Sequence, residues 1–388
     1  MLPLFFIVLL SCFQAKLVTA QLDDDSLPYN YYSSSPITPR PWGPQFESWY
    51  PDHAKFLTNV SQGICNLTLR DYRAAYEGHR YSLNGSQILA RCYRHEACIL
   101  SQYGANFQAN AQGASIVLGL IPTLLSVIGP NVGEIYLLSI HRPLLATLLS
   151  IGSPTYQIAR LFEYHHPGNL LNAEDGKLQI SVSSTYSIVS LSIIEYLVAL
   201  MASGLVVYTS IEMGQKTILA WGCTTQFAPL LWAVLTVVPQ IFVAGGYLAT
   251  SWNTDAEQPA PHRRPHRSRT VISQKDVILK KLRALALWLL HALKREVTIC
   301  AKQELRPGVV EQGPRLMVVL NIAAECMSYV LWAFGTAVFS SLLFLSVHDV
   351  FIQIFWPLII SAVLCRTIVI IELAGLRKVR NFSIIPDS

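Results

Sequence analysis

The sequence predicts an all-α fold, a polytopic transmembrane helix bundle of about five spans with a small N-terminal lumenal or extracellular domain. Composition is the first reason, because 52% of the 388 residues are hydrophobic and only 14% are charged, whereas soluble proteins usually contain about 25% charged residues. The second is a set of five long apolar runs. The third is a polar N-terminal segment that carries three glycosylation motifs behind an apolar leader. This pattern favours a multi-pass membrane protein and gives no indication of nucleic-acid binding.

The chain begins with a stretch typical of a signal peptide. Residues 1–20 contain an apolar core of about ten residues and end in Val-Thr-Ala, whose small side chains fit a signal-peptidase site. The alternative is a short anchoring helix, but this core is shorter than the ~20 residues that cross a bilayer. Residues 21–48 are acidic and then rich in Ser, Pro and Tyr, a composition typical of a disordered lumenal tail.

Residues 49–110 are predicted to form a small glycosylated lumenal domain. Asn59, Asn66 and Asn84 each stand two positions before a Ser or Thr, which is the pattern of N-glycosylation acceptors. One such motif is a common chance match. Three of them close together behind a signal peptide indicate a lumenal or extracellular compartment.

The same domain contains three cysteines, Cys65, Cys92 and Cys98. An oxidising compartment favours disulfides, and we favour Cys92–Cys98 or Cys65–Cys92. Because three is an odd number, we expect one cysteine to stay free, to pair between chains, or to reach Cys223 near a membrane edge.

Five apolar runs are long enough to cross a bilayer of ~30 Å hydrocarbon. A sixth candidate, residues 135–151, is interrupted by His141-Arg142-Pro143 and is predicted to be an interfacial or re-entrant segment within a cytosolic loop, residues 130–185. Spans 1–3 fall within residues 111–250 and spans 4–5 within residues 316–375. The five predicted spans are residues 111–129, 186–208, 217–248, 316–346 and 351–375.

The distribution of basic residues sets the predicted orientation. Residues 251–315 contain 13 Lys and Arg residues against 6 Asp and Glu residues, a net charge of +7. With a lumenal N-terminus and five spans, this loop and the tail 376–388 both lie in the cytosol, as the positive-inside rule requires. A sixth span would place both basic segments in the lumen.

The basic loop contains a predicted amphipathic helix, residues 275–297. Its apolar centre is too short to span, so we expect it to lie on the cytosolic leaflet against anionic lipid headgroups. Packing of the same helix on a partner protein is the alternative. The residues expected at the membrane surface are Lys280, Lys281, Arg283, Trp288, Lys294 and Arg295.

Three charged residues lie inside predicted spans, namely Glu195, Glu325 and Arg366. A charge at the bilayer centre costs about 2.5–3.5 kcal/mol even on insertion scales. All three lie at similar depth on the cytosolic side of the centre, so we predict that Arg366 pairs with Glu195 or Glu325. The alternatives are a structural ionic clamp and a transport site, in which the leftover Glu is protonated or binds a cation or substrate. Asn321 and Ser328 flank Glu325 at helical spacing and extend this polar patch.

No motif for enzymatic catalysis is present in the sequence. We therefore expect no catalytic residue, no metal site and no cofactor. The first functional hypothesis is a non-enzymatic receptor, sensor or assembly factor of the secretory pathway or cell surface, with a protein partner or a second copy of the chain. The second is a transporter or channel subunit for a small solute or ion that uses the intramembrane charges. The third is a membrane-embedded enzyme acting on a lipid-like substrate.

The segments IVLGLIPTLLSVIGPNVGE, HRPLLATLLSIGSP and FGTAVFSSLLFLSVHDV are similar to a group of uncharacterised multi-pass membrane proteins of filamentous fungi. The resemblance extends from the cysteine-containing region through the last span, with a variable cytosolic loop. It implies a fungal origin and an endomembrane or cell-surface location. It carries no functional residue over to this chain.

Overall fold

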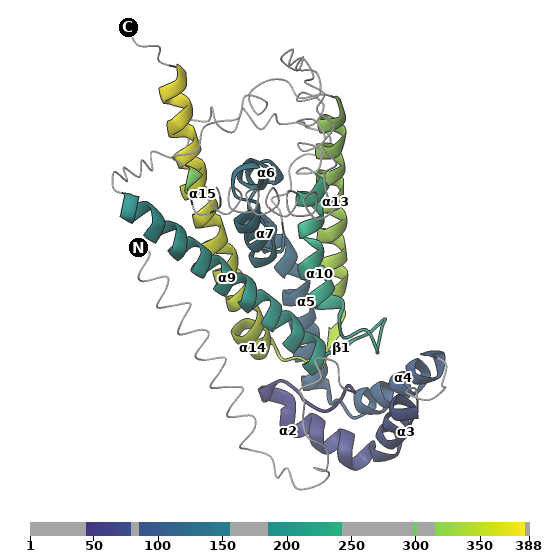
Figure 1. Cartoon of the computed structure of the whole chain (residues 1–388). Helices are drawn as coiled ribbons and strands as arrows, with labels where there is room; N and C mark the ends of the chain where they lie inside the picture. Colours follow the sequence, from purple (N-terminus) through teal and green to yellow (C-terminus); the bar gives the residue numbers. More distant parts are fainter. Residues whose placement is uncertain are drawn as a thin grey trace, which may run out of the picture.

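Four long apolar helical segments form the body of the protein (Figure 1). Each has at least 18 residues, and ~20 apolar residues are enough to cross a bilayer, so the computed structural model is that of an integral membrane protein. The four segments are Ala105–Ile128 in α5, Val189–Lys216 in α9 (Thr185–Lys216), Val318–Ser340 in α13 (Arg315–Ser340), and Val347–Leu376, which joins α14 (Val347–Asp349), η4 (Val350–Phe355) and most of α15 (Trp356–Ile384).

The structure describes residues 44–78, 85–155, 185–242, 296, 298–300 and 315–384. The predicted signal peptide, the N-terminal part of the predicted tail and nearly all of the predicted amphipathic helix 275–297 lie outside these residues. The same holds for Asn84 and for the six residues predicted to contact the membrane surface: Lys280, Lys281, Arg283, Trp288, Lys294 and Arg295.

Large apolar side chains on the long helices point away from the protein core. On α5 they recur three or four residues apart, which places them on one face of the helix. Such a continuous exposed apolar face is typical of contact with lipid rather than with water. The exposed large apolar residues on α5 are Ile116, Leu120, Leu124 and Val127.

Two short helices, α6 (Val132–His141) and α7 (Pro143–Gly152), lie between the long ones (Figure 1). Their break at Arg142 falls where the sequence predicts an interruption. However, residues 135–142 are all buried, whereas an interfacial helix keeps a polar face in water. The interfacial alternative is therefore wrong, and this segment packs inside the bundle.

The predicted span 217–248 is not one continuous helix. Its first residues form strand β1 (Ile218–Leu219), which pairs antiparallel with β2 (Leu342–Leu343), and helix α10 (Ala228–Leu235) begins only after a turn. Pro229 lies in the first turn of α10, where its missing N–H is tolerated. The apolar helix Ala228–Phe242 is shorter than the four long segments, and the rest of the predicted span lies beyond the described residues.

The N-terminal helices gather at one end of the bundle, close to β1 and α14 (Figure 1). They are α2 (Pro51–Asn59), η1 (Val60–Ile64), α3 (Asn66–Gly78) and α4 (Gly85–Ser101). Their core includes Ile218 of β1 and Phe344, which directly follows β2. The Phe344 ring packs edge-on against Trp49, with 5.3 Å between ring centroids. The N-terminal helices thus share a hydrophobic core with the bundle.

Two further core clusters fill the bundle. One joins α6, α7, α9 and α15 and includes Leu138 and Val369. The other joins α5, α10, α13 and α15 and includes Trp232 and Phe339. In the second cluster α10 and α13 approach closely, because a Cβ added at Gly335 would lie 2.3 Å from Trp232 Nε1. A larger residue at Gly335 would separate these two helices.

Candidate functional site

The break between α6 and α7 is built around Arg142. Pro143 disfavours a helical conformation in the residue before it, and Arg142 has φ −137° and ψ 74°. Its N–H still donates to the carbonyl of Leu138 at 2.7 Å, which closes the last turn of α6. The local sequence therefore ends one helix and starts the next at an arginine.

Four hydrogen bonds hold the Arg142 guanidinium, which is completely buried. Nη1 donates to Glu195 Oε2 at 2.6 Å and to Glu372 Oε1 at 2.7 Å. Nη2 donates to Ser192 Oγ at 2.6 Å, and Nε donates to the carbonyl oxygen of Glu296 at 2.9 Å. Arg142 thereby joins the α6–α7 break to α9, to α15 and to residue 296.

The carboxylates of this site have further donors. Glu372 Oε2 accepts from the backbone N–H of Cys300 at 3.0 Å. Glu296 Oε1 accepts from the backbone N–H of Leu144 in the first turn of α7, where the helix dipole favours a negative charge. We name the group Arg142, Ser192, Glu195, Glu296 and Glu372 the Arg142 cluster.

Charge in the Arg142 cluster is not balanced one to one. The carboxyl groups of Glu195 and Glu372 both contact one guanidinium, and Glu296, whose backbone carbonyl accepts from Arg142, adds a third carboxyl group to the cluster. All three of these residues are at most 5% exposed. An arginine stays charged in proteins, and a buried ion is stable only when its partners are in place. The cluster can therefore act as an ionic clamp among four segments, and its acidic excess can hold a proton.

Arg366 has a different partner from the one predicted. Its Nη1 contacts Glu134 Oε2 on α6, and Glu134 also accepts from the N–H of Asn131 at 2.8 Å as part of a capping box. The predicted pairing of Arg366 with Glu195 or Glu325 is wrong. The reason is that α6 and α7 enter the bundle, so that Arg142 and Glu134 lie at the depth of the charges on α9 and α15.

Glu325 is not one of the partners of Arg142 or Arg366. It lies on α13, where the side-chain amide of Asn321 donates to its carboxylate at 3.3 Å, in agreement with the predicted polar patch. Ser328 instead donates to the backbone carbonyl of Ala324 at 2.9 Å. The predicted three-residue charge cluster is thus divided among three places in the bundle.

Sequence reasoning missed Arg142 and Glu372 as site residues. Their sequence context could have identified both residues. Glu372 lies inside the apolar run of the last span, and Arg142 directly precedes a proline in an apolar run. Because residues 135–151 were predicted to be an interfacial or re-entrant segment rather than a span, Arg142 was not considered as a partner for the charges in the spans.

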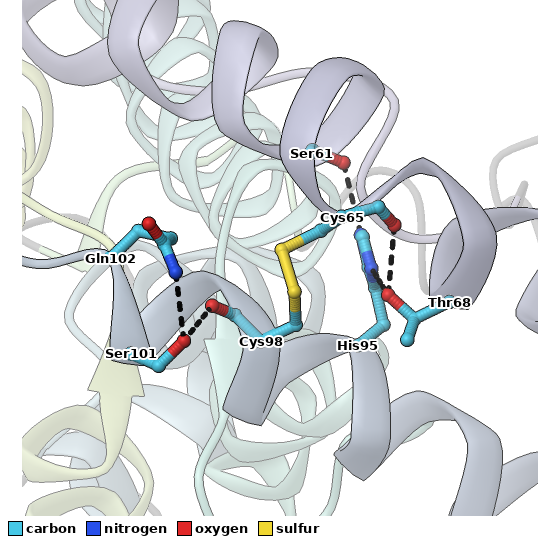
Figure 2. Close-up of a disulfide and its surroundings, with 7 residues drawn as sticks. All are labelled: Ser61, Cys65, Thr68, His95, Cys98, Ser101 and Gln102. Atoms are coloured by element: carbon cyan, nitrogen blue, oxygen red, sulfur yellow. Dashed lines mark hydrogen bonds between the residues drawn. A yellow bond between two sulfur atoms is a disulfide. The ribbon is translucent and has the colours of Figure 1, made fainter.

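A second buried polar group lies in the N-terminal helices, beside a disulfide (Figure 2). His95 contacts Ser61 Oγ through Nε2 at 2.9 Å and Thr68 Oγ1 through Nδ1 at 2.8 Å. Thr68 donates its own hydrogen to the carbonyl of Cys65, so it accepts from Nδ1–H, and Ser61 donates to Nε2. Burial, together with the charge of Arg73, lowers the pKa of His95 to about 4, which keeps this ring neutral.

Ser61 and Thr68 are also the hydroxyl residues of the motifs at Asn59 and Asn66. Both asparagine side chains are exposed, as a glycan would require. The two hydroxyls therefore have a structural partner in His95 whether or not the asparagines carry glycans.

The cysteines form two disulfides, Cys65–Cys98 and Cys92–Cys223, each with 6.0 Å between Cα atoms. The two favoured pairings, Cys92–Cys98 and Cys65–Cys92, are wrong. The alternative that one cysteine reaches Cys223 is confirmed. Helical geometry explains the difference, because Cys92 and Cys98 are six residues apart on α4 and point to different sides of that helix.

Among the described residues, no group of three or more His, Cys, Asp or Glu side chains could hold a metal ion. Comparison of the chain with protein-family models, with curated proteins and with solved structures found no match. The resemblance to membrane proteins of filamentous fungi stays a prediction.

Proposed function

We propose that the chain is a non-enzymatic multi-pass membrane protein of the secretory pathway or cell surface that acts as a receptor or sensor through its N-terminal helices. The Cys92–Cys223 disulfide carries this proposal, since it links α4 to the turn between β1 and α10. A ligand that displaces α4 must therefore also act on the bundle at the ends of α9 and α10.

Non-covalent contacts support the same coupling. Tyr50, which directly precedes α2, is completely buried in the core that α5, α10 and α13 share, and Lys216 at the end of α9 lies over its ring at 5.5 Å. The backbone N–H of Asp52 donates to Asp349 of α14 at 3.3 Å. A domain that only anchors or solubilises the chain has no need of such connections to the bundle core, to α9 and to α14.

The proposal includes the topology and modifications of the chain. The N-terminal helices lie in the lumen or outside the cell, the apolar helix Ala228–Phe242 continues into a fifth span, and the C-terminus is cytosolic. Two disulfides support an oxidising compartment, and Asn59, Asn66 and Asn84 are the proposed glycan acceptors.

The coupling can be tested with an artificial ligand. An antibody fragment raised against the N-terminal helices is added to the full-length chain in detergent, and hydrogen exchange is measured in residues 218–242. We expect exchange there to change on binding, and the change to be lost when Cys92 and Cys223 are both replaced by Ser. Unchanged exchange in the oxidised wild-type chain, with the fragment bound, would contradict the sensor role.

A transporter is the second candidate. The observation that favours it is the break between α6 and α7 with charged groups at the break, since transporters bind substrates at discontinuous helices. Against it, the Arg142 donors are already used by protein groups. Vesicles that contain the reconstituted chain and an internal pH dye test this candidate. Proton flux through the wild-type chain that is lost in Glu195→Gln supports transport. Equal proton leakage from wild-type and Glu195→Gln vesicles argues against it.

A further inference from the structure

We propose that the Arg142 cluster is a proton-binding site, in which Glu195 and Glu372 hold one proton between them. The site differs from the receptor function proposed above and does not depend on it. It also does not require transport, because a bound proton can stabilise the bundle without crossing it.

The first observation is that two carboxyl groups meet at one nitrogen atom. Arg142 Nη1 lies 2.6 Å from Glu195 Oε2 and 2.7 Å from Glu372 Oε1. Because both oxygens contact the same nitrogen atom, the two carboxyl groups lie close together, and the repulsion between two negative charges disfavours ionisation of both groups. A proton on one of them removes this repulsion.

The second observation is an oxygen atom without a donor. Glu195 Oε1 has no hydrogen-bond partner among the described residues, and the Glu195 side chain is only 3% exposed. Leaving a charged carboxylate oxygen buried and unsatisfied is unfavourable by several kcal/mol on typical scales. A neutral carboxyl group at Glu195 removes most of this penalty.

The third observation is the set of charged and titratable groups that face the pair from each neighbouring element. Arg142 is the positive charge among them, and Glu296 adds a third carboxyl group, which has its own donor in the N–H of Leu144. Apolar residues of α6 and α15 surround the cluster, so solvent does not screen repulsion between like charges. Among the described residues, these neighbouring groups are Arg142 and the buried His141 at the α6–α7 break, Tyr196 on α9, and Glu296 and Cys300 from residues 296–300.

A consequence for the bundle follows from this arrangement. With the proton bound, one ionised carboxylate and one neutral carboxyl group share the guanidinium, and α9 and α15 are held together. When the proton leaves, the two carboxylates repel each other across the contact between α9 and α15. The cluster therefore responds to the pH on the side of the membrane from which protons reach it.

The test measures the protonated carboxyl group directly by infrared spectroscopy on the full-length chain in detergent. Every chain compared carries Glu96→Gln, because burial raises the pKa of Glu96 to about 7 and this group would add a band of its own. We expect the chain that is otherwise wild-type to show the carbonyl stretch of a buried protonated carboxyl group at neutral pH, and to lose it as the pH is raised. Glu195→Gln and Glu372→Gln should each remain folded and lose this band, because the amide replaces the protonated partner and leaves one carboxylate for Arg142.

The matched control is Glu134→Gln, which removes a carboxylate that Arg366 contacts singly. This variant should keep the band unchanged. A Glu96→Gln chain without the band at any pH, or a band that persists when Glu195→Gln and Glu372→Gln are each added to it, would overturn the proposal.

A second measurement needs no variant. Hydrogen exchange of the wild-type chain, corrected for the intrinsic effect of pH, should become several-fold faster in residues 189–205 and 360–376 across the same pH range in which the band disappears. If these residues stay equally protected while the band is lost, the proton does not hold α9 and α15 together, and the proposed coupling is wrong.

Discussion

The two ends of the bundle are held together by different chemistry. At the end that carries α2 to α4, two disulfides and a neutral histidine connect the segments. At the end where α6 lies (Figure 1), Arg142 and the carboxyl groups around it connect them. His95 and Arg142 are both completely buried, yet the first is surrounded by hydroxyl groups and the second by carboxyl groups.

The difference follows from the two side chains. An imidazole can lose its proton and be satisfied by one donor and one acceptor, whereas a guanidinium remains charged and needs carboxylates. A buried charge makes each of its partners indispensable, because removing one leaves another charge uncompensated. We therefore expect the Arg142 end to tolerate substitution less well than the disulfide-linked end.

Arg142→Met should have the largest effect. It leaves Glu195 and Glu372 facing each other without a cation, and loss of one member of a buried ionic group typically costs about 3–5 kcal/mol. Thermal unfolding of the chain in detergent measures this loss. Adding Glu195→Gln and Glu372→Gln to the same chain should restore part of the stability, and no recovery would show that Arg142 acts through packing rather than charge.

Cys223→Ser should come next. It opens the Cys92–Cys223 link, which closes a loop of 131 residues, and loss of a native disulfide typically costs about 2–5 kcal/mol. We expect faster hydrogen exchange in α4 and in the β1–α10 turn, with α9 and α15 near Arg142 unchanged. Cys326→Ser is the control, since Cys326 is not in a disulfide; equal effects of both variants would contradict a specific role of this link.

Arg366→Leu should have a smaller effect than Arg142→Met, about 1 kcal/mol. The Arg366 side chain is 27% exposed, and Glu134 keeps the N–H of Asn131 after the change. Glu134→Gln should compensate for Arg366→Leu, and Glu195→Gln should not. Thermal unfolding of the single and double variants measures these effects. If Arg366→Leu lost as much stability as Arg142→Met, the two arginines would not differ in the way proposed.

The net pH dependence of the N-terminal helices in the wild-type chain should be the smallest effect, because two contributions oppose each other. Burial lowers the pKa of His95 to about 4 and raises the pKa of Glu96 to about 7. His95 therefore lowers stability as pH falls from 6.5 toward 4, because the unfolded chain takes up its proton first. Glu96 lowers stability as pH rises from 4.5 toward 7, because the unfolded chain releases its proton first. The two contributions oppose each other between pH 4.5 and 6.5.

Glu96→Gln separates these contributions. In this variant, protection of α3 and α4 against hydrogen exchange, after correction for intrinsic rates, should rise steadily with pH from 4 to 6.5. Each unit of difference between the folded and unfolded pKa of His95 changes the free energy of unfolding by at most about 1.4 kcal/mol. The wild-type chain should show a flatter profile, and the same profile in both chains would exclude Glu96 as a contributor.

The sequence predicted several features of the fold and the site correctly. Long apolar runs predicted α5, α9, α13 and α15, because helix length and hydropathy are local properties. His141-Arg142-Pro143 predicted a break, because proline acts on the residue before it. The prediction of disulfides was also correct, whereas the preferred pairings Cys92–Cys98 and Cys65–Cys92 were wrong.

By itself, then, the sequence determined that the chain enters a membrane, that a helix is interrupted at His141-Arg142-Pro143, and that its intramembrane charges need partners. Only the tertiary structure decided which partners they have. Arg142 meets Glu195 and Glu372 across 53 and 230 residues of chain, and Arg366 meets Glu134 instead of either predicted acid. The physical reason is that charge pairing depends on the depth and rotation of helices far apart in sequence, and these are set by the packing of α6 and α7 inside the bundle.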